Sequence, residues 1–157
     1  MIENPAEFTA FLCRAKLATY AGKGPTTPSS RPASHDLHYR EHLPGGEYLY
    51  IDTYLGGFRF AGEEAVWKDG APVWGMNYYG WMLVPAIPEG FGDFLKEALR
   101  QVPASAPYRG PKEWQNGRYA YACDWEGALE GFYGQEWIML GGEPVYRLLF
   151  HGGIILP

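Results

Sequence analysis

The sequence predicts an α+β fold, in which an antiparallel sheet carries two helices packed on one face. Three observations support this: an amphipathic helix pattern near the N-terminus, strand patterns bounded by glycine-rich turns, and an approximate recurrence of both later in the chain. The predicted order is α-βββ-α-βββ, an internal duplication with halves at about residues 5–82 and 91–153. A length of 157 residues predicts a single domain spanning residues 1–157.

The first helix is predicted to begin after Asn4 and to end before Gly22. Asn4 can cap the helix with its side chain, and Pro5 suits the first helical position because no backbone N–H is needed there. Apolar residues then recur at three- and four-residue spacing, which is typical of one buried helix face. That face comprises Phe8, Phe11, Leu12, Ala15 and Ala18.

A second helix with the same spacing is predicted before Pro103, which cannot continue a helix. Each helix is followed by a proline-containing connection without periodicity, over residues 23–34 and 103–111. The apolar face of the second helix comprises Phe91, Phe94, Leu95, Ala98, Leu99 and Val102. It resembles the first face at an offset of 83 residues, which supports the predicted duplication.

The first strands are predicted from side-chain alternation. Residues 35–41 form a short mixed run, and residues 47–55 alternate clearly. One face of the second run carries Tyr48, Tyr50, Asp52 and Tyr54. In the second half, strands are predicted over residues 118–126, 132–140 and 143–152.

A β-hairpin predicted over residues 62–80 is the pattern that recurs most clearly. Its centre, Asp69-Gly70, readily takes the positive φ angles of a type I′ turn. Shifted by 72 positions, the hairpin falls on residues of the same type in the second half, and Asp52 falls on Asp124. The matched pairs are Gly62 with Gly134, Glu64 with Glu136, Gly70 with Gly142, Pro72 with Pro144, Val73 with Val145 and Gly80 with Gly152.

A two-residue turn at Asp69-Gly70 fixes a register in which Glu64 lies opposite Gly75, with Trp67 and Trp74 on the other face. The same register in the second hairpin places Glu136 opposite Arg147, which supplies a cross-strand cation. Glu64 would then be an acid without a partner beside a hollow, suited to an organic cation. The alternative is that Glu64 points into solvent.

Composition excludes several classes of protein. The net charge of −5 and the lack of a basic run argue against a nucleic-acid surface. No apolar run is long enough for a membrane helix, so we expect a soluble cytoplasmic protein. Cys13 and Cys123 lack the spacing of metal ligands and are expected to be buried thiols. No nucleophile, phosphate-loop or dinucleotide motif is found, and we expect no metal, no cofactor and no catalytic residue.

Six runs of residues resemble an uncharacterised bacterial domain family of unknown function. They are Ser34-His35-Asp36-Leu37-His38-Tyr39-Arg40, Tyr50-Ile51-Asp52-Thr53-Tyr54, Phe60-Ala61-Gly62-Glu63-Glu64-Ala65-Val66-Trp67, Met76-Asn77-Tyr78-Tyr79-Gly80, Pro107-Tyr108-Arg109-Gly110-Pro111 and Phe150-His151-Gly152-Gly153. In some members of that family the domain follows a helix-turn-helix DNA-binding domain, which implies a sensor-type role. Because this chain begins at the domain's first helix, we expect a stand-alone member. The duplicated plan also resembles the effector-binding domains of multidrug-responsive bacterial regulators, by architecture alone.

The leading functional hypothesis is a non-catalytic module that binds a small, partly apolar and cationic ligand. The expected ligand-binding residues are Glu64, Asp52, Asn77, Tyr79, Tyr50, Phe60 and His151. Glu64 is the favoured anchor; Asp52 could instead be satisfied by tyrosine hydroxyls within a buried network.

Two alternatives from other classes stay open. A small hydrolase or isomerase would use Asp52 or Glu64 as general base with His151 or a tyrosine as partner. It predicts that the acid and His151 lie within hydrogen-bond reach, directly or through one water. A protein-interaction or dimerisation domain would use the exposed aromatic strands and form a homodimer.

Overall fold

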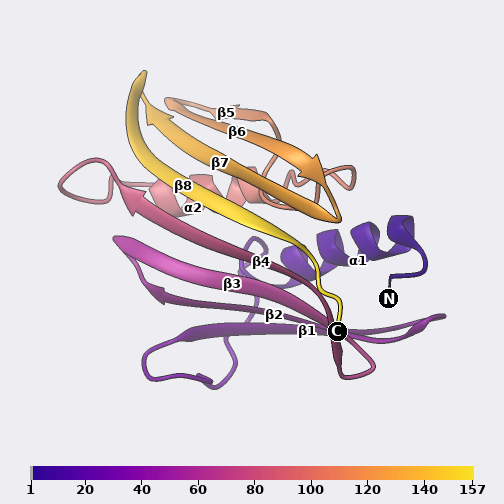
Figure 1. Cartoon of the computed structure of the whole chain (residues 1–157). Helices are drawn as coiled ribbons and strands as arrows, with labels where there is room; N and C mark the ends of the chain where they lie inside the picture. Colours follow the sequence, from indigo (N-terminus) through magenta and orange to yellow (C-terminus); the bar gives the residue numbers. More distant parts are fainter. Residues whose placement is uncertain (1) are drawn as a thin grey trace.

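The computed structural model describes residues 2–157, which form two helices and eight strands (Figure 1). The elements are α1 (Pro5–Ala18), β1 (His35–Leu43), β2 (Gly46–Gly56), β3 (Arg59–Lys68), β4 (Ala71–Met82), α2 (Phe91–Leu99), β5 (Glu113–Asn116), β6 (Tyr119–Ala128), β7 (Gly131–Leu140) and β8 (Glu143–Ile154). The α+β class is therefore confirmed. The prediction of three strands per half is wrong, because residues 35–43 form a full strand and the short edge strand β5 was not predicted.

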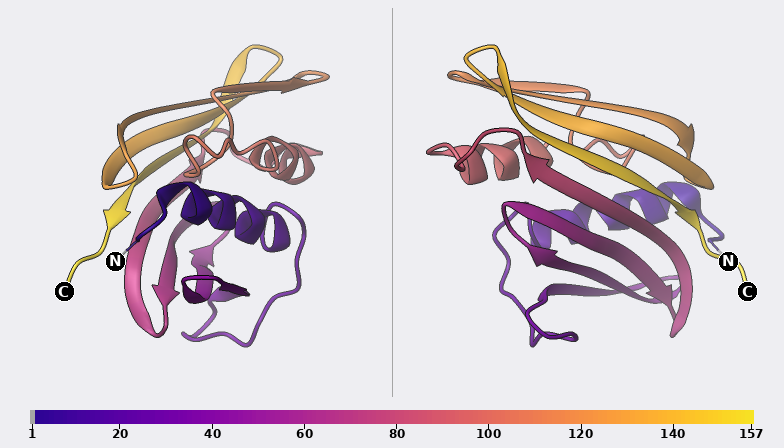
Figure 2. Two further views of the ribbon diagram at one scale, coloured as in Figure 1. Left: turned by 90° about the vertical axis from the view of Figure 1, so that its right-hand side faces the viewer. Right: turned by 60° about the vertical axis from the view of Figure 1, so that its left-hand side comes forward.

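All eight strands belong to one antiparallel sheet in the order β1-β2-β3-β4-β8-β7-β6-β5. The two halves join at the centre, where β4 pairs with β8. Both helices lie on the same side of the curved sheet, α1 against β1 and α2 against β5 and β6 (Figure 2). Their apolar faces and the inner face of the sheet form one core, and the predicted arrangement of helices on one face is confirmed.

The helices form where their capping signals predict. In α1, Asn4 Oδ1 accepts a hydrogen bond from the Glu7 backbone N–H, 3.2 Å away, and a proline stands in the first turn. The helix ends at Ala18, before the predicted stop, where the Thr19 hydroxyl bonds back to the Ala15 carbonyl at 2.8 Å. Neither described helix has the length and apolar content needed to span a bilayer.

The predicted hairpin register is wrong beyond the first two residue pairs. Trp67 lies opposite Pro72 as predicted, but a β-bulge between Val66 and Trp67 then shifts the pairing, so Glu64 lies opposite Met76 rather than Gly75. Since a shift of one residue exchanges the faces of a strand, Trp74 lies on the same face as Glu64. The sequence does not mark the bulge with a glycine, so the tight turn alone misled the prediction.

The second hairpin carries the same irregularity. A bulge between Ile138 and Met139 places Glu136 opposite Leu148, while Arg147 lies opposite Trp137. The predicted Glu136–Arg147 pair is therefore wrong. Each bulge lies close to the tight turn that precedes the last strand of its half. The two bulges are 72 residues apart in the sequence.

The strand pairings of the two halves can be aligned with each other. Residues that occupy the same position in this alignment are called counterparts. In β3 and β4 the counterparts lie 72 residues later, as in Glu64 and Glu136. In β2 the offset is 71, because the turn over residues 128–131 is one residue longer than the turn over 57–59. The counterpart of Asp52 is therefore Cys123, and the predicted match to Asp124 is wrong.

Candidate functional site

Two buried acids face each other on the inner side of the first half. Asp52 on β2 lies opposite Glu64 on β3, and their residues are only 4% and 3% exposed. Tyr50 shares their face because side chains two positions apart on a strand point the same way. The alternative in which Glu64 points into solvent is therefore wrong.

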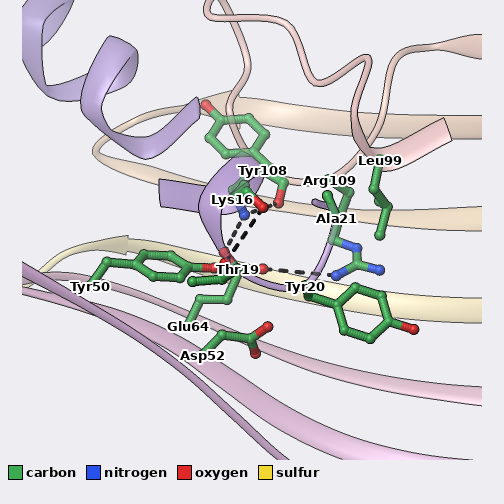
Figure 3. Close-up of a pocket in the computed structure, with 10 residues that line it drawn as sticks. All are labelled: Lys16, Thr19, Tyr20, Ala21, Tyr50, Asp52, Glu64, Leu99, Tyr108 and Arg109. Atoms are coloured by element: carbon green, nitrogen blue, oxygen red, sulfur yellow. Dashed lines mark hydrogen bonds and ion pairs between the residues drawn. The ribbon is translucent and has the colours of Figure 1, made fainter. Parts of the chain in front are cut away.

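Glu64 has cationic partners from outside the sheet. Lys16 on α1 donates to Glu64 and also to the Tyr108 carbonyl oxygen, at 2.9 Å. From the connection between α2 and β5, Arg109 places Nη1 3.8 Å from Glu64 Oε1. Figure 3 shows Lys16 and Arg109 reaching the acid from above the sheet. The expectation of an unpaired Glu64 is wrong, since both partners come from segments that its strand register does not involve.

Glu136, the counterpart of Glu64, is fully paired. Arg109 donates to it through Nε and Nη2, at 3.0 and 2.8 Å, and Tyr121 and Tyr146 donate their hydroxyls at 2.7 and 2.8 Å. Burial raises the pKa of Glu136, but the charge and hydrogen bonds of Arg109 and the tyrosine hydroxyls outweigh it and hold the pKa below its ordinary value. Glu136 is therefore a structural anion.

On the inner face of the sheet, Asp52 is the acid that remains when the buried charges are paired. The two buried cations, Lys16 and Arg109, are matched by Glu64 and Glu136. Among the described residues, Asp52 accepts one side-chain hydrogen bond, from the Tyr78 hydroxyl at 2.7 Å. Burial and the nearby charge of Glu64 raise the pKa of Asp52 to about 7, against the lowering by Tyr78 and by both cations. Asp52 therefore exchanges its proton near neutral pH.

A cavity of about 260 Å³ adjoins Asp52 between the sheet and the first turns of α2. Its walls are largely aromatic, and Asp52 and Arg109 are the charged residues that reach it. Its lining comprises Tyr20, His35, Asp52, Tyr54, Gly56, Gly57, Phe60, Tyr78, Ile87, Phe91, Gly92, Leu95 and Arg109. We call it the Asp52 cavity.

A second, smaller space of about 20 Å³ lies behind the Asp52 cavity and is large enough for a single water molecule. Tyr20, Asp52 and Arg109 line both spaces. Figure 3 shows the smaller one, with Tyr50 and Glu64 on its sheet side. The buried ion pairs therefore form the back of the larger cavity.

The structure brings four of the seven predicted ligand-binding residues together. Asp52 and Phe60 line the Asp52 cavity, and Tyr50 and Glu64 line the small space behind it. The other three, Asn77, Tyr79 and His151, lie on the outer face of the sheet.

The outer position of these three residues follows from the bulge. It reverses the predicted faces of β4, where Trp74, Met76 and Tyr78 point inward and Asn77 and Tyr79 outward. His151 lies opposite Asn77 on β8 and shares its face. Because the sheet separates His151 from Asp52 and Glu64, the pair required by the hydrolase or isomerase alternative is not formed.

The outer face also carries large exposed side chains, among them Tyr79, Tyr133 and Leu149. They fit the alternative of an interaction or dimerisation surface, which stays a prediction. Several residues of the site were missed from the sequence: Lys16, Tyr20, Tyr54, Tyr78 and Arg109. The sequence does indicate that Lys16 is unusual. It follows Leu12 by four residues and so lies on the apolar face of its helix.

Comparison with known proteins identifies the family. A family model described as a domain of unknown function, DUF5680, matches residues 52–155. The chain belongs to the DUF5680 family. The matched region includes Asp52, Glu64, Arg109 and Glu136, and it leaves out α1 with Lys16. No curated protein and no solved structure matches the chain.

Proposed function

We propose that this protein is a non-catalytic binding module for a small, partly apolar organic cation, held in the Asp52 cavity. The observation that carries the proposal is the balance of buried charge. Lys16 and Arg109 are matched by Glu64 and Glu136, so Asp52 is the acid that borders these pairs without a cation of its own. Asp36 is also buried without a cation, but it accepts from the Ser30 backbone N–H and the Thr53 hydroxyl at 2.8 and 2.7 Å and does not line the cavity. A bound cation would pair with the Asp52 carboxylate where water is largely excluded.

The walls of the cavity support an organic rather than an inorganic cation. Tyr54, Phe60 and Phe91 present aromatic side chains, and the His35 ring stacks on Tyr54 with centroids 4.8 Å apart. Aromatic faces attract cations and also bury apolar surface. The ligand would therefore join a positive group to an apolar body.

Asp52 replaces Glu64 as the proposed anchor. Glu64 already has Lys16 and Arg109, so binding a further cation there would compete with the protein's own ion pairs. Tyr50 and Glu64 instead hold the back of the site in place. The resemblance to effector-binding domains of multidrug-responsive regulators supports a sensor-type role by analogy.

We also infer that the two halves arose by internal duplication. Matching bulges, matching registers and the positive-φ glycines Gly56 and Gly127 at counterpart positions support this. At the sheet centre, Tyr78 pairs with its own counterpart Phe150, as an approximate two-fold axis would require.

The test is calorimetric titration and thermal unfolding of the whole protein at pH 8 with benzylamine, 2-phenylethylamine, tryptamine and n-hexylamine. At 100 times its dissociation constant, a bound amine stabilises the fold by about 2.7 kcal/mol. For a protein of this size that amounts to several degrees in Tm. Lowering the pH from 8 to 6 should weaken binding about tenfold, because Asp52, whose pKa is about 7, must be ionised.

Two variants isolate the anchor. Asp52→Asn should abolish the stabilisation by these amines, while Asp124→Asn should leave it unchanged. Asp124 is the matched control because it is an aspartate on the corresponding strand β6 but exposed on the outer face. Failure of all four amines to bind, or equal binding by Asp52→Asn, contradicts the proposal.

A further inference from the structure

In the second half, one aromatic side chain covers a ring that has an open counterpart in the first half. The Tyr108 ring stacks on Phe132 with centroids 3.8 Å apart and planes 14° apart, and it meets Trp125 edge-on at 6.3 Å. Tyr108 comes from the connection between α2 and β5 and is 3% exposed. It is therefore a buried ring held by aromatic contacts with the sheet.

The residues around Tyr108 have counterparts that line the Asp52 cavity. Phe132 corresponds to Phe60, and Trp125 corresponds to Tyr54. Both counterparts line the Asp52 cavity, as does Asp52, whose counterpart is Cys123. The cavity thus lies over Phe60 as the Tyr108 ring lies over Phe132.

The remaining contacts of the two phenylalanines also correspond. Phe60 stacks on Tyr146 with centroids 6.2 Å apart, and Phe132 stacks on Trp74 at 5.9 Å. Tyr146 and Trp74 are themselves counterparts. The difference is therefore local: Phe132 is buried beneath Tyr108, whereas Phe60 is only partly buried beside the cavity.

The connection that could supply a matching ring in the first half does not do so. Residues 19–34 link α1 to the edge strand β1, as residues 100–112 link α2 to the edge strand β5. In this connection Tyr20 meets the Tyr54 ring edge-on at 6.0 Å, as Tyr108 meets Trp125, but no contact between Tyr20 and Phe60 matches the stacking of Tyr108 on Phe132. Tyr20 lines the Asp52 cavity, and no residue of 21–34 does. The first half thus has no ring from this connection stacked on Phe60.

We propose that the ligand of the Asp52 cavity is an arylalkylamine. Its planar ring stacks on Phe60, as Tyr108 stacks on Phe132, and its ammonium group donates to Asp52. This inference rests on the proposed function and specifies its ligand. An ammonium that carries an N–H is required because Asp52, which accepts from Tyr78, needs a further donor when it is buried and ionised. A quaternary ammonium cannot supply that donor.

Three compounds of matched size test the inference by calorimetry at pH 8. They are 2-phenylethylamine, its saturated analogue 2-cyclohexylethylamine, and the uncharged 3-phenylpropan-1-ol. The saturated amine should bind about 3- to 10-fold more weakly, which corresponds to the worth of one aromatic contact. The alcohol should bind at least tenfold more weakly, since it offers Asp52 no charge.

Three further variants locate the ring. Phe60→Leu should weaken 2-phenylethylamine to the level of the cyclohexyl analogue. Phe132→Leu, the matched control, should lower Tm and leave the affinity unchanged. Gly92→Tyr should raise Tm and abolish binding, because Gly92 lines the cavity and an added Cβ there meets no heavy atom within 4 Å.

The outcomes separate this inference from the proposed function. Equal affinity for the two amines, with no effect of Phe60→Leu, overturns the aromatic-ring assignment and leaves a cation-binding module standing. Binding that persists in folded Gly92→Tyr overturns the location. If neither amine binds the wild-type protein, the proposed function falls and this inference falls with it.

Discussion

The two halves of the molecule differ in how their buried acids are paired and in how the space above their central phenylalanines is filled. In the second half, Glu136 accepts hydrogen bonds from Arg109, Tyr121 and Tyr146, and the space above Phe132 is filled by Tyr108. In the first half, the corresponding strands carry a second acid, Asp52, beside an open aromatic cavity. In the second half the protein's own side chains pair the buried acid and cover the central phenylalanine, while the first half leaves Asp52 without a cation and Phe60 beside a cavity.

This difference indicates where a ligand would act. A buried acid that lacks a cation and a cavity that lacks a ring both cost free energy in the folded protein. The fold tolerates these costs in the first half because Arg109, the Lys16–Glu64 pair and the complete second half hold the sheet together. The following variants test whether the halves differ as the structure indicates.

The largest expected effect belongs to the second half. Glu136→Gln leaves Arg109 buried without its bidentate partner, and breaking such a pair costs about 3 to 5 kcal/mol of unfolding free energy. Urea denaturation at pH 7 measures the loss. Glu126→Gln, on the exposed outer face of β6, is the control and should leave the urea midpoint unchanged. A loss below about 1 kcal/mol would mean that Glu136 does not anchor the sheet.

Removing the internal ring should open a second cavity. Tyr108→Ala is expected to lower the unfolding free energy by about 3 kcal/mol, in the range for deleting a buried aromatic side chain. Addition of 4-methylphenol should restore part of the Tm by refilling the space over Phe132. Phe60→Ala should cost less, because Phe60 already borders a cavity. Equal losses for both variants would contradict the comparison of a filled half with an open half.

The pH dependence of stability should carry the signature of Asp52. Its pKa of about 7 in the folded protein lies above its ordinary value of 3.8. Between these values the folded state holds a proton that the unfolded state has lost, so stability falls as the pH rises from about 4 to 7. Asp52→Asn has no such proton, and its Tm advantage over the wild type should grow by a few degrees across this range.

Thermal unfolding from pH 4.5 to pH 8 measures this difference. Asp124→Asn should show a constant offset from the wild type. A constant offset for Asp52→Asn as well would show that the pKa of Asp52 in the folded protein is close to its ordinary value. That outcome would argue against Asp52 as the anchor.

The smallest expected effect concerns the mouth of the cavity. Gly92→Ala should stabilise the protein by about 0.5 to 1 kcal/mol, because alanine favours the helix and the added Cβ meets open space. Gly62→Ala is the opposite case: its Cβ would lie 2.3 Å from the Tyr78 ring and should destabilise the fold. Destabilisation by Gly92→Ala, measured by urea denaturation, would show that this wall of the cavity is closed.

Local signals predicted much of the fold. Asn4 and Pro5 marked the start of α1, the alternation around Asp52 marked β2, and Asp69-Gly70 marked the turn between β3 and β4. Such signals act over a few residues, so they are visible in one sequence. They did not reveal the bulge between Val66 and Trp67. The resulting one-residue shift in register reversed the predicted faces of β4 and changed the expected neighbours of Glu64.

The candidate site was predicted in part for the same reason. Asp52, Tyr50, Glu64 and Phe60 share a face of two adjacent strands, and their alternation in the sequence brings them together. Asn77, Tyr79 and His151 were assigned to the site through a register that the bulge changes. Lys16 and Arg109 could not be placed because no strand pairing relates them to the acids.

By itself, the sequence determined the class of the fold, the two amphipathic helices, the turns and the recurrence of the hairpin, because these depend on spacing between near neighbours. Only the tertiary structure decided which acid on the inner face of the sheet is left without a cation. Lys16 approaches Glu64 from a helix 48 residues away, and Arg109 approaches Glu136 from a connection 27 residues away. Charge balance in a core is a property of packed segments, and it becomes visible when the chain is folded.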